Sequence, residues 1–335
     1  MWSITAALSW LTGRDELIEP IEPAVRTPEE ILSNPYLPSV LDVIVVKSML
    51  VKGLKLPLEL IDSIVDQAEY WPHTSSEINY ATGDSPFYTV GYSTTADDSE
   101  NELLLRAVPL GFLKWPPQDP PLEKARNLHP TAVQPSPPGE QFPADVFQGL
   151  MGYPVPLVTH PCRKIVFTTR SRDQAWGGDA QDHHTYHGSW TWFEAGLERW
   201  TRKQGDSPPE TQMQPSLALK DLTAIYPPVV AENENTYKYD HQLLPSENLK
   251  VQCNKTAVHE TLEHTVVWRY TDDMDPENEQ AAAELASSGR GTATGDGRFV
   301  RQLELGDIVT LWGKTRFPGW ANHVESVKVE VYWVV

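Results

Sequence analysis

The sequence predicts a mainly β protein, an antiparallel β-sandwich with a small helical region at its N-terminal end. Segments with the alternation of half-buried strands recur from about residue 87 to the end, separated by long connections, whereas helical apolar spacing is concentrated in residues 1–80. The regular alternation of strands and helices found in nucleotide-binding folds is absent, and neither a GxGxxG motif nor a phosphate-binding loop occurs. We therefore expect an antiparallel sheet protein without a cofactor.

The composition indicates a globular chain and argues against two classes of partner. Of the 335 residues, 40% are hydrophobic and 22% are charged, and the net charge is −19. Nucleic acids and anionic membrane surfaces both attract basic proteins, so we expect neither as a partner. The two cysteines, Cys162 and Cys253, make no disulfide framework. A reduced cytoplasmic or nuclear location is expected in preference to secretion.

The first residues of the N-terminal region are mostly apolar as far as Arg14. They are too few to span a bilayer and no basic residues precede them, so we interpret them as a docked or amphipathic helix, with a signal peptide as the alternative. Further along, Thr27-Pro28-Glu29-Glu30 has the form of a capping box, which predicts the start of a helix.

Two further helices are predicted before residue 73. The first carries an apolar stripe and ends at Gly53, although its β-branched run also suits a short strand. The stripe consists of Leu41, Ile44, Val45 and Met49. The second begins at Pro57, and its apolar face consists of Leu60, Ile61, Ile64, Val65 and Ala68.

The second helix begins within LKLPLELIDSIVDQAEYW, residues 54–71, which resembles the opening of an F-box. In that family Leu-Pro-x-Glu starts a helix that docks on a Skp-type ubiquitin-ligase adaptor, so the resemblance implies a Skp-like partner. The later F-box helices are not evident in the following residues. A helix packed on its own domain is the alternative, because Leu-Pro-x-Glu is also a good helix start.

The predicted sandwich covers residues 87–335. Its strand-like segments are FYTVGYS, ELLLRAVPL, CRKIVFTTRS, SWTWFE, LKVQCN, HTVVWRYTD, RFVRQLELGDIVTLWGKTRF and VESVKVEVYWVV. A proline-rich insertion, 109–161, and an irregular stretch, 201–248, interrupt them. The acidic, alanine-rich residues 272–291 predict a short helix or a surface loop. In the last segment valines alternate with polar residues, which predicts one buried face.

The densest group of reactive side chains lies in SRDQAWGGDAQDHHTYHGSWTWFE, residues 171–194. His183, His184 and His187 contain an H-x-x-H spacing that would suit a metal on a helix. Glycines bracket the segment and zinc-peptidase spacing is absent, so we expect solvated loop histidines and no metal site. A hydrolase that uses Asp173, Glu194 and these histidines is an alternative, but no G-x-S-x-G occurs and sequence cannot give the separation of two carboxylates.

Two tryptophans beside glycines, Trp176 and Trp320, share a local pattern. In each case a strand ends in a basic residue followed by a tryptophan-bearing turn with amide or carboxylate partners. If both turns lie at one rim of the sandwich, they form a polar and aromatic pocket. The candidate ligand-binding residues are Asp173, Gln174, Trp176, Arg316, Trp320, Asn322 and His323. The alternative is a structural plug, with Asp173 paired to Arg172 or Arg316 and capping backbone donors in the turn.

The segments IVFTTRSRDQAWGG, YHGSWTWFEAG, GRGTATGDGRFVRQLELGDIVTLW and RFPGWANHVESVKVEVYW resemble a group of uncharacterised fungal proteins. The shared pattern is Ser-[Arg/His]-Asp-Gln-Gly-Trp followed by Ser-Trp-Thr-Trp-Phe and Pro-Gly-Trp-x-Asn, over residues 87–335. The resemblance implies a jelly-roll or galactose-binding-like sandwich and no assigned reaction. This chain departs from the pattern at Ala175, where the group has glycine, and alanine would be strained there if the glycine takes positive φ.

These observations together predict a non-catalytic binding protein. Its sandwich rim or face would hold a glycan or a protein ligand, because tryptophan offers a large flat apolar surface with one hydrogen-bond donor. Two alternatives remain at this point: an F-box-type adaptor that recruits a Skp-like protein, and the hydrolase.

Overall fold

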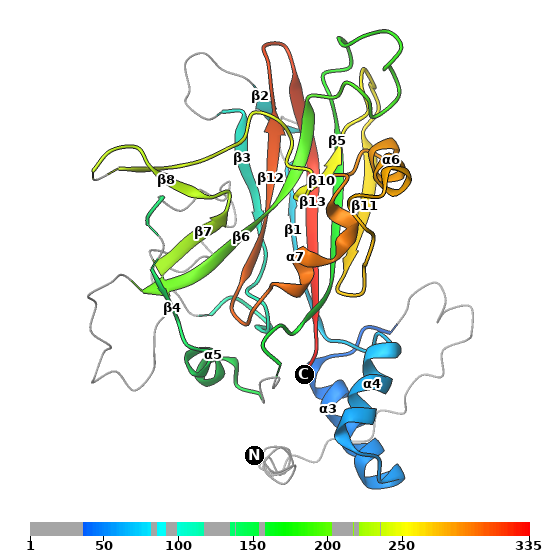
Figure 1. Cartoon of the computed structure of the whole chain (residues 1–335), viewed down its shortest axis with the longest axis vertical. Helices are drawn as coiled ribbons and strands as arrows, with labels where there is room; N and C mark the ends of the chain where they lie inside the picture. The colour runs from blue at the N-terminus through cyan, green and yellow to red at the C-terminus, as the bar shows by residue number, and fades with distance from the viewer. Residues whose placement is uncertain are drawn as a thin grey trace. The chain divides into compact units, whose positions relative to one another are not determined.

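The computed structural model confirms the mainly β fold class. It describes residues 36–81, 86–91, 99–116, 135–137, 139–153, 158–202, 217, 221–234 and 236–335. The chain forms two compact units, a smaller one up to His73 with 153–156 and 334–335, and a larger one from Thr74 to Trp333. The smaller unit contains helices and the larger one antiparallel sheets (Figure 1). The predicted capping box at Thr27 lies outside the described residues.

The smaller unit contains helices α3 (Val40–Met49) and α4 (Leu58–Gln67), joined by the π-helical turn η1 (Leu50–Leu54). Helix α3 begins with a capping box in which Asp42 N donates to the Ser39 hydroxyl and Ser39 N donates to the Asp42 carboxylate, at 3.2 and 2.8 Å. The helical turns pass through Gly53, where a stop was predicted, and end one residue later.

Helix α4 begins directly after Pro57, as predicted. The buried side chains of the two helices are Val40, Val43, Ile61 and Val65. Much of the predicted apolar stripe of α3 therefore faces outward, because α3 buries its other side. The exposed large apolar side chains of the two helices and of η1 are Leu41, Val45, Met49, Leu54, Leu58, Leu60 and Ile64.

The first sheet of the larger unit has five strands. Their order is β1 (His73–Asn79), β13 (Ala321–Trp333), β5 (Cys162–Arg172) and β11 (Leu262–Arg269), and β2 (Tyr88–Gly91) also pairs with β13. The strands therefore begin at residue 73, earlier than the predicted sandwich. The alternation in the last strand does bury one face, formed by Val327, Val329, Val331 and Trp333.

The second sheet has six strands. The path is β10 (Lys250–Cys253), β6 (Thr191–Arg202), β12 (Ile308–Thr315) and β3 (Asn101–Arg106), while β4 (Glu140–Gln141) and β7 (Leu222–Tyr226) pair with β6. A two-stranded hairpin, β8 (Val229–Ala231) with β9 (Tyr237–Tyr239), follows β7. The predicted irregular stretches 109–161 and 201–248 thus include β4, β7, β8 and β9, and helix α5 (Ala144–Met151).

The apolar core lies between the two sheets. A Cβ atom added at Gly313 of β12 would lie 3.0 Å from Val90 of β2, in the other sheet, and 2.8 Å from Leu104 of β3. The core includes large side chains that are almost completely excluded from solvent, among them Phe167, Trp268 and Trp333. Trp192 is also 0% exposed, but it lies on the other face of β6, where its Nε1 donates to Glu194.

The outer face of β12 and its neighbours is polar and is covered by the chain after β9. Lys314 is only 2% exposed, and its Nζ donates to Asn101 Oδ1 and His241 Nδ1 at 3.1 and 2.6 Å. The Glu194 carboxylate lies 3.6 Å from the same nitrogen. The ring of His241 also packs edge-on against Trp312, with 5.0 Å between ring centroids. The segment after β9 therefore shields the ion pair of Lys314 and Glu194 from water.

The connection between β11 and β12 carries helices α6 (Glu279–Ser287) and α7 (Arg298–Arg301) and the 3-10 turn η4 (Thr294–Asp296). The predicted helix in the alanine-rich stretch is confirmed. The prediction of strand for RFVR was wrong, because Phe299 and Val300 are buried on one side of a helical turn. A turn at Gly306, with φ of +84°, leads into β12.

Both cysteines of the larger unit are buried and free. Burial raises the pKa of each thiol, Cys162 and Cys253, to about 12, so neither is ionised near neutral pH. None of the helices in the described ranges combines the length and apolar character needed to cross a bilayer.

Candidate functional site

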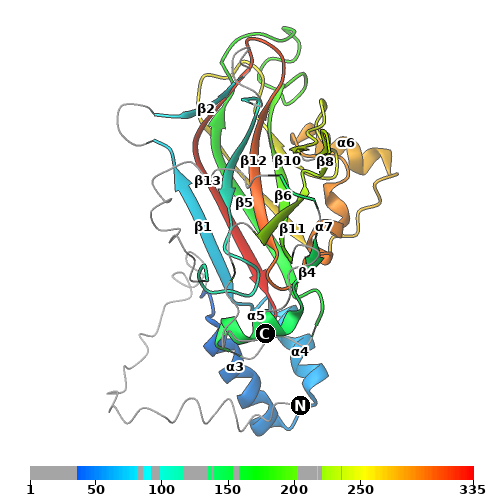
Figure 2. The same cartoon turned by 90° about the vertical axis from the view of Figure 1, so that its left-hand side faces the viewer.

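Three loops meet at one end of the larger unit. They are residues 173–190 between β5 and β6, 254–261 between β10 and β11, and 316–320 between β12 and β13, and we call this end the tryptophan rim (Figures 1 and 2). The antiparallel pairing brings them together, because the end of β5 lies beside the starts of β11 and β13, and the start of β6 beside the ends of β10 and β12.

The two tryptophan turns pack against each other. A Cβ atom added at Gly319 would lie 3.2 Å from the ring of Trp176, and one added at Gly178 would lie 3.7 Å from the ring of Trp320. Each indole ring therefore lies beside a glycine of the other turn. Gln174 joins the turns as well: its side-chain amide nitrogen donates to the carbonyl of Trp176, and Ala321 N donates to its amide oxygen at 3.1 Å.

Asp173 faces the protein. Its side chain is 0% exposed, and Oδ1 accepts from Ala175 N at 2.8 Å and from Val258 N at 3.2 Å, while Oδ2 accepts from Ala257 N. Burial raises the pKa of Asp173, and these three backbone donors oppose that rise. The carboxylate thus joins the β5–β6 loop to the β10–β11 loop.

Arg316 and Asn322 are also enclosed. Arg316 is 2% exposed, its guanidinium donates to backbone carbonyls that include those of Gln242 and Leu243, and it stacks 5.1 Å from the ring of Trp192. Asn322 is 0% exposed, and its Nδ2 donates to the carbonyl of Trp192 at 3.2 Å. Three of the seven predicted ligand-binding residues, Asp173, Arg316 and Asn322, are thus buried and bonded to protein groups.

A buried polar network lies beneath the rim and connects the two sheets. Asn254 is at its centre: Nδ2 donates to Thr191 Oγ1 and Asn322 Oδ1 at 3.0 and 2.9 Å, and Oδ1 accepts from the Ser171 hydroxyl at 2.7 Å. Asn254 fits the glycosylation pattern Asn-Lys-Thr, but only 1% of it is exposed, so the folded protein does not present it for modification.

Four predicted residues remain at the surface. Trp176 is 63% exposed, whereas Gln174, Trp320 and His323 are half-buried. The Nδ1 of His323 lies 2.9 Å from the Thr89 hydroxyl, and burial lowers the pKa of this histidine. Of the seven predicted ligand-binding residues, only these four are therefore partly exposed to solvent.

The structure adds aromatic residues that the sequence analysis did not select. Phe317 is 42% exposed and packs edge-on against Trp190, with 4.7 Å between ring centroids. Trp190 and Phe317 belong to the same two loops as Trp176 and Trp320. The signal for Phe317 was its place in the Pro-Gly-Trp turn, which sequence reasoning assigned only to Trp320.

Backbone strain is concentrated in the rim. In the described part of the chain six residues other than glycine have positive φ, and four of them belong to the three rim loops. These four are Ala175, His184, Ala257 and Phe317. Such conformations cost free energy and persist where surrounding contacts impose them, and they occur often at binding sites.

The loop histidines do not assemble a metal site. The Nε2 of His183 lies 3.1 Å from the Gly177 carbonyl, and His184 is exposed with its backbone N–H bonded to the carbonyl of Thr256. Within the residues that the structure describes, no group of three or more His, Cys, Asp or Glu side chains has the arrangement of metal ligands.

The two carboxylates of the hydrolase alternative are already engaged. Glu194 Oε1 accepts from Trp192 Nε1 at 2.8 Å and from Ser246 N at 3.0 Å, and Oε2 faces Lys314. The Asp173 carboxylate is enclosed by backbone donors, as described above. The geometry therefore gives the hydrolase alternative no support, because general acid–base catalysis needs a carboxyl group within reach of substrate.

Comparison of the chain with protein-family models, with curated proteins and with solved structures found no match.

Proposed function

We propose that this chain is a non-catalytic binding protein whose tryptophan rim holds a glycan. The observation that supports this most directly is Trp176, a 63% exposed indole whose loop is fixed to two other loops. An exposed aromatic ring in a mobile loop would lose conformational entropy on binding. A ring already held in place loses little, which favours affinity.

The chemistry around Trp176 suits a sugar ring. An indole offers a flat apolar face against which the C–H face of a sugar packs, and nearby polar groups can bind its hydroxyls. Phe317 supplies a second exposed ring from the neighbouring turn. Strain in all three loops further supports a binding role, since the fold stabilises unfavourable conformations at this end of the molecule.

The test is a glycan array and equilibrium titration with the full-length protein. We expect the wild type to bind at least one glycan, and Trp176→Ala and Phe317→Ala to weaken that binding at least about 10-fold, as for other exposed aromatic anchors. Leu244→Ala is the matched control, because Leu244 is an exposed apolar side chain, 57% exposed, outside the rim loops.

A pull-down with the same variants covers the protein-ligand version of the proposal. A protein captured by the wild type and by Leu244→Ala, but not by Trp176→Ala, would replace the glycan by a protein ligand at the same rim. Absence of any ligand for the wild type in both experiments would contradict a binding role for the rim.

A second candidate function, an F-box-type adaptor, has its own supporting observation. The Leu-Pro-x-Glu motif starts α4 at Leu58, and the helices around it expose large apolar side chains, including Leu54 at 63% and Leu58 at 53%. Several large exposed apolar side chains on neighbouring helices are typical of a protein-binding face. After α4 the chain enters β1. Within the described residues, this apolar face therefore belongs to α3, η1 and α4.

Co-purification of the full-length chain with a Skp homologue tests the adaptor. We expect Leu58→Asp with Ile64→Asp to abolish the complex, because both side chains are exposed on α4, while Leu244→Asp leaves it intact. Failure of the wild type to co-purify with the homologue would contradict this candidate and would leave the glycan proposal untouched.

A further inference from the structure

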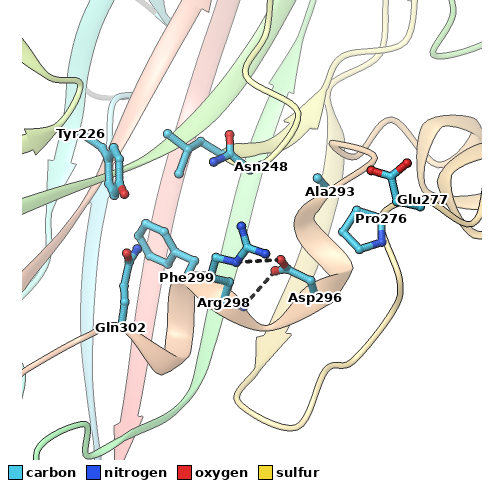
Figure 3. Close-up of a pocket in the computed structure, with 10 residues that line it drawn as sticks. Tyr226, Asn248, Pro276, Glu277, Ala293, Asp296, Arg298, Phe299 and Gln302 are labelled. Atoms are coloured by element: carbon cyan, nitrogen blue, oxygen red, sulfur yellow. Dashed lines mark hydrogen bonds and ion pairs between the residues drawn. The ribbon is translucent and has the colours of Figure 1, made fainter.

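A pocket of about 250 Å³ lies at the edge of the sandwich that the β11–β12 connection covers (Figure 3). Its walls include Tyr226 at the end of β7, Asn248 just before β10, and Phe299 of α7. It is separate from the tryptophan rim, because Asn248 precedes β10 and the rim loop begins after that strand.

Two aromatic side chains form the apolar part of this pocket. Phe299 is 7% exposed and packs against Trp268 of the core with 5.2 Å between ring centroids, which fixes its position. The ring of Tyr226 lies 6.5 Å from that of Phe299 at an interplanar angle of 40°. A ligand in the pocket would therefore meet preformed ring surfaces.

Several polar side chains around these rings have hydrogen-bonding capacity to spare. Within the described residues, neither the Tyr226 hydroxyl nor the Gln302 side-chain amide makes a hydrogen bond to the protein, and the Nδ2 of Asn248 makes none, although its Oδ1 accepts from Ser246. Figure 3 shows these side chains grouped around the ring of Phe299. Amide and hydroxyl groups both donate and accept, which matches the hydroxyls of a sugar.

Two of the three charged side chains of the pocket, Arg298 and Asp296, are paired with each other. Arg298 Nε lies 3.4 Å from Asp296 Oδ2, and Arg298 N donates to Asp296 Oδ1 at 2.9 Å. An anionic ligand would meet the carboxylates of Asp296 and Glu277, and a cationic ligand would meet Arg298. Because the lining has two carboxylates and a mostly exposed arginine, it disfavours an anionic ligand.

We propose that this pocket binds a single neutral sugar residue. A pyranose ring has the apolar C–H face that Tyr226 and Phe299 would contact and the hydroxyls that Asn248 and Gln302 would bind. The pocket is narrow, below the roughly 300 Å³ of sites for drug-sized ligands, which suits one ring and not an extended chain.

Nuclear magnetic resonance titration of the full-length protein tests this proposal. The probes are glucose, galactose, mannose and N-acetylglucosamine, with glucuronic acid and glucosamine as charged analogues. We expect at least one neutral sugar to shift the backbone amide signals of Asn248, Phe299 and Gln302, and the anionic analogue, glucuronic acid, to bind about 10-fold more weakly.

Variants separate the pocket from the rim. Tyr226→Phe and Gln302→Leu remove a hydroxyl or an amide while keeping size, and each should weaken sugar binding about 2- to 10-fold, the usual effect of one hydrogen bond. Trp176→Ala should leave pocket binding unchanged. The proposal is overturned if no neutral sugar shifts these amides at millimolar concentration, if Tyr226→Phe and Gln302→Leu bind as tightly as the wild type, or if Trp176→Ala abolishes the shifts. Failure of the glycan proposal for the rim would not overturn the proposal for this pocket.

Discussion

Ala175 illustrates how one residue reports the geometry of the rim. Its φ is +69°, a left-handed conformation that costs a residue with a Cβ atom about 1–2 kcal/mol. The backbone N–H of the same residue donates to Asp173 at 2.8 Å, and this bond helps to hold the conformation. The position thus favours glycine, which adopts this conformation without steric cost.

Ala175→Gly should stabilise the protein by about 1 kcal/mol, because glycine adopts positive φ without steric cost. Urea unfolding measures this change. Ala283→Gly is a control of opposite sign: Ala283 is exposed in the middle of α6, so glycine there should destabilise by about 1 kcal/mol. A loss of stability in Ala175→Gly would contradict the assigned backbone conformation.

Asp173 shows that a buried carboxylate can serve the fold alone. Asp173→Ala leaves three backbone N–H groups without their acceptor, so the free energy of unfolding should fall by about 2–4 kcal/mol. Asp273→Ala, at an exposed position, should change it by less than about 0.5 kcal/mol. Thermal unfolding of the two variants makes the comparison, and equal stabilities would refute the stapling role of Asp173.

At the scale of elements, the segment that follows β9 encloses His241 against charged residues. Burial, with the positive charges of Lys314 and Arg316, lowers the pKa of His241 to about 2 from an ordinary value of 6.5. The unfolded chain therefore takes up a proton as the pH falls below 6.5, whereas the folded protein does not. Stability that is fully present above that pH is lost as the pH falls toward the folded pKa.

His241 alone should therefore cost about 2 kcal/mol of stability between about pH 7 and about pH 5. Burial also lowers the pKa of His264 and His323, so the difference between wild type and His241→Gln isolates this contribution. Glutamine retains an acceptor for Lys314 and does not titrate. Denaturant unfolding at both pH values should show a smaller loss for His241→Gln, and identical losses would exclude His241 as the source.

The strands with strong alternation could be predicted from the sequence, and the short ones could not. In β5 and β13 every second residue is buried over a long run, so the period is visible without the partner strand. Strands β8 and β9 have three residues each, too few to show a period. Their pairing depends on a turn and on the polar face of β12 beneath them.

Part of the rim was also predictable, from a pattern shared by two turns. The two tryptophan turns share a local pattern, which led to the hypothesis that they lie at one rim. In the structure each tryptophan ring lies beside a glycine of the other turn. The contribution of residues 254–261 depends on Asp173, Thr185 and His184 bonding across to Ala257 and Thr256, contacts between positions far apart in the chain. A sequence pattern carries no sign of such contacts.

For the whole molecule, the sandwich acts as a rigid support. A buried network of polar side chains ties its two sheets at the rim, and apolar residues fill the space between them. The fold therefore holds the exposed aromatic side chains at this end in place, and we expect them to contribute little to its stability. We therefore expect stability and ligand binding to depend on different residues.

The most direct test measures stability and ligand affinity on the same variant, Trp176→Ala. We expect the free energy of unfolding to change by less than about 1 kcal/mol, because the indole is mostly exposed. Affinity for the ligand found by glycan array should fall at least about 10-fold. A loss of several kcal/mol in stability with ligand affinity unchanged would contradict this expectation, and would make Trp176 a structural plug that closes this end of the sandwich.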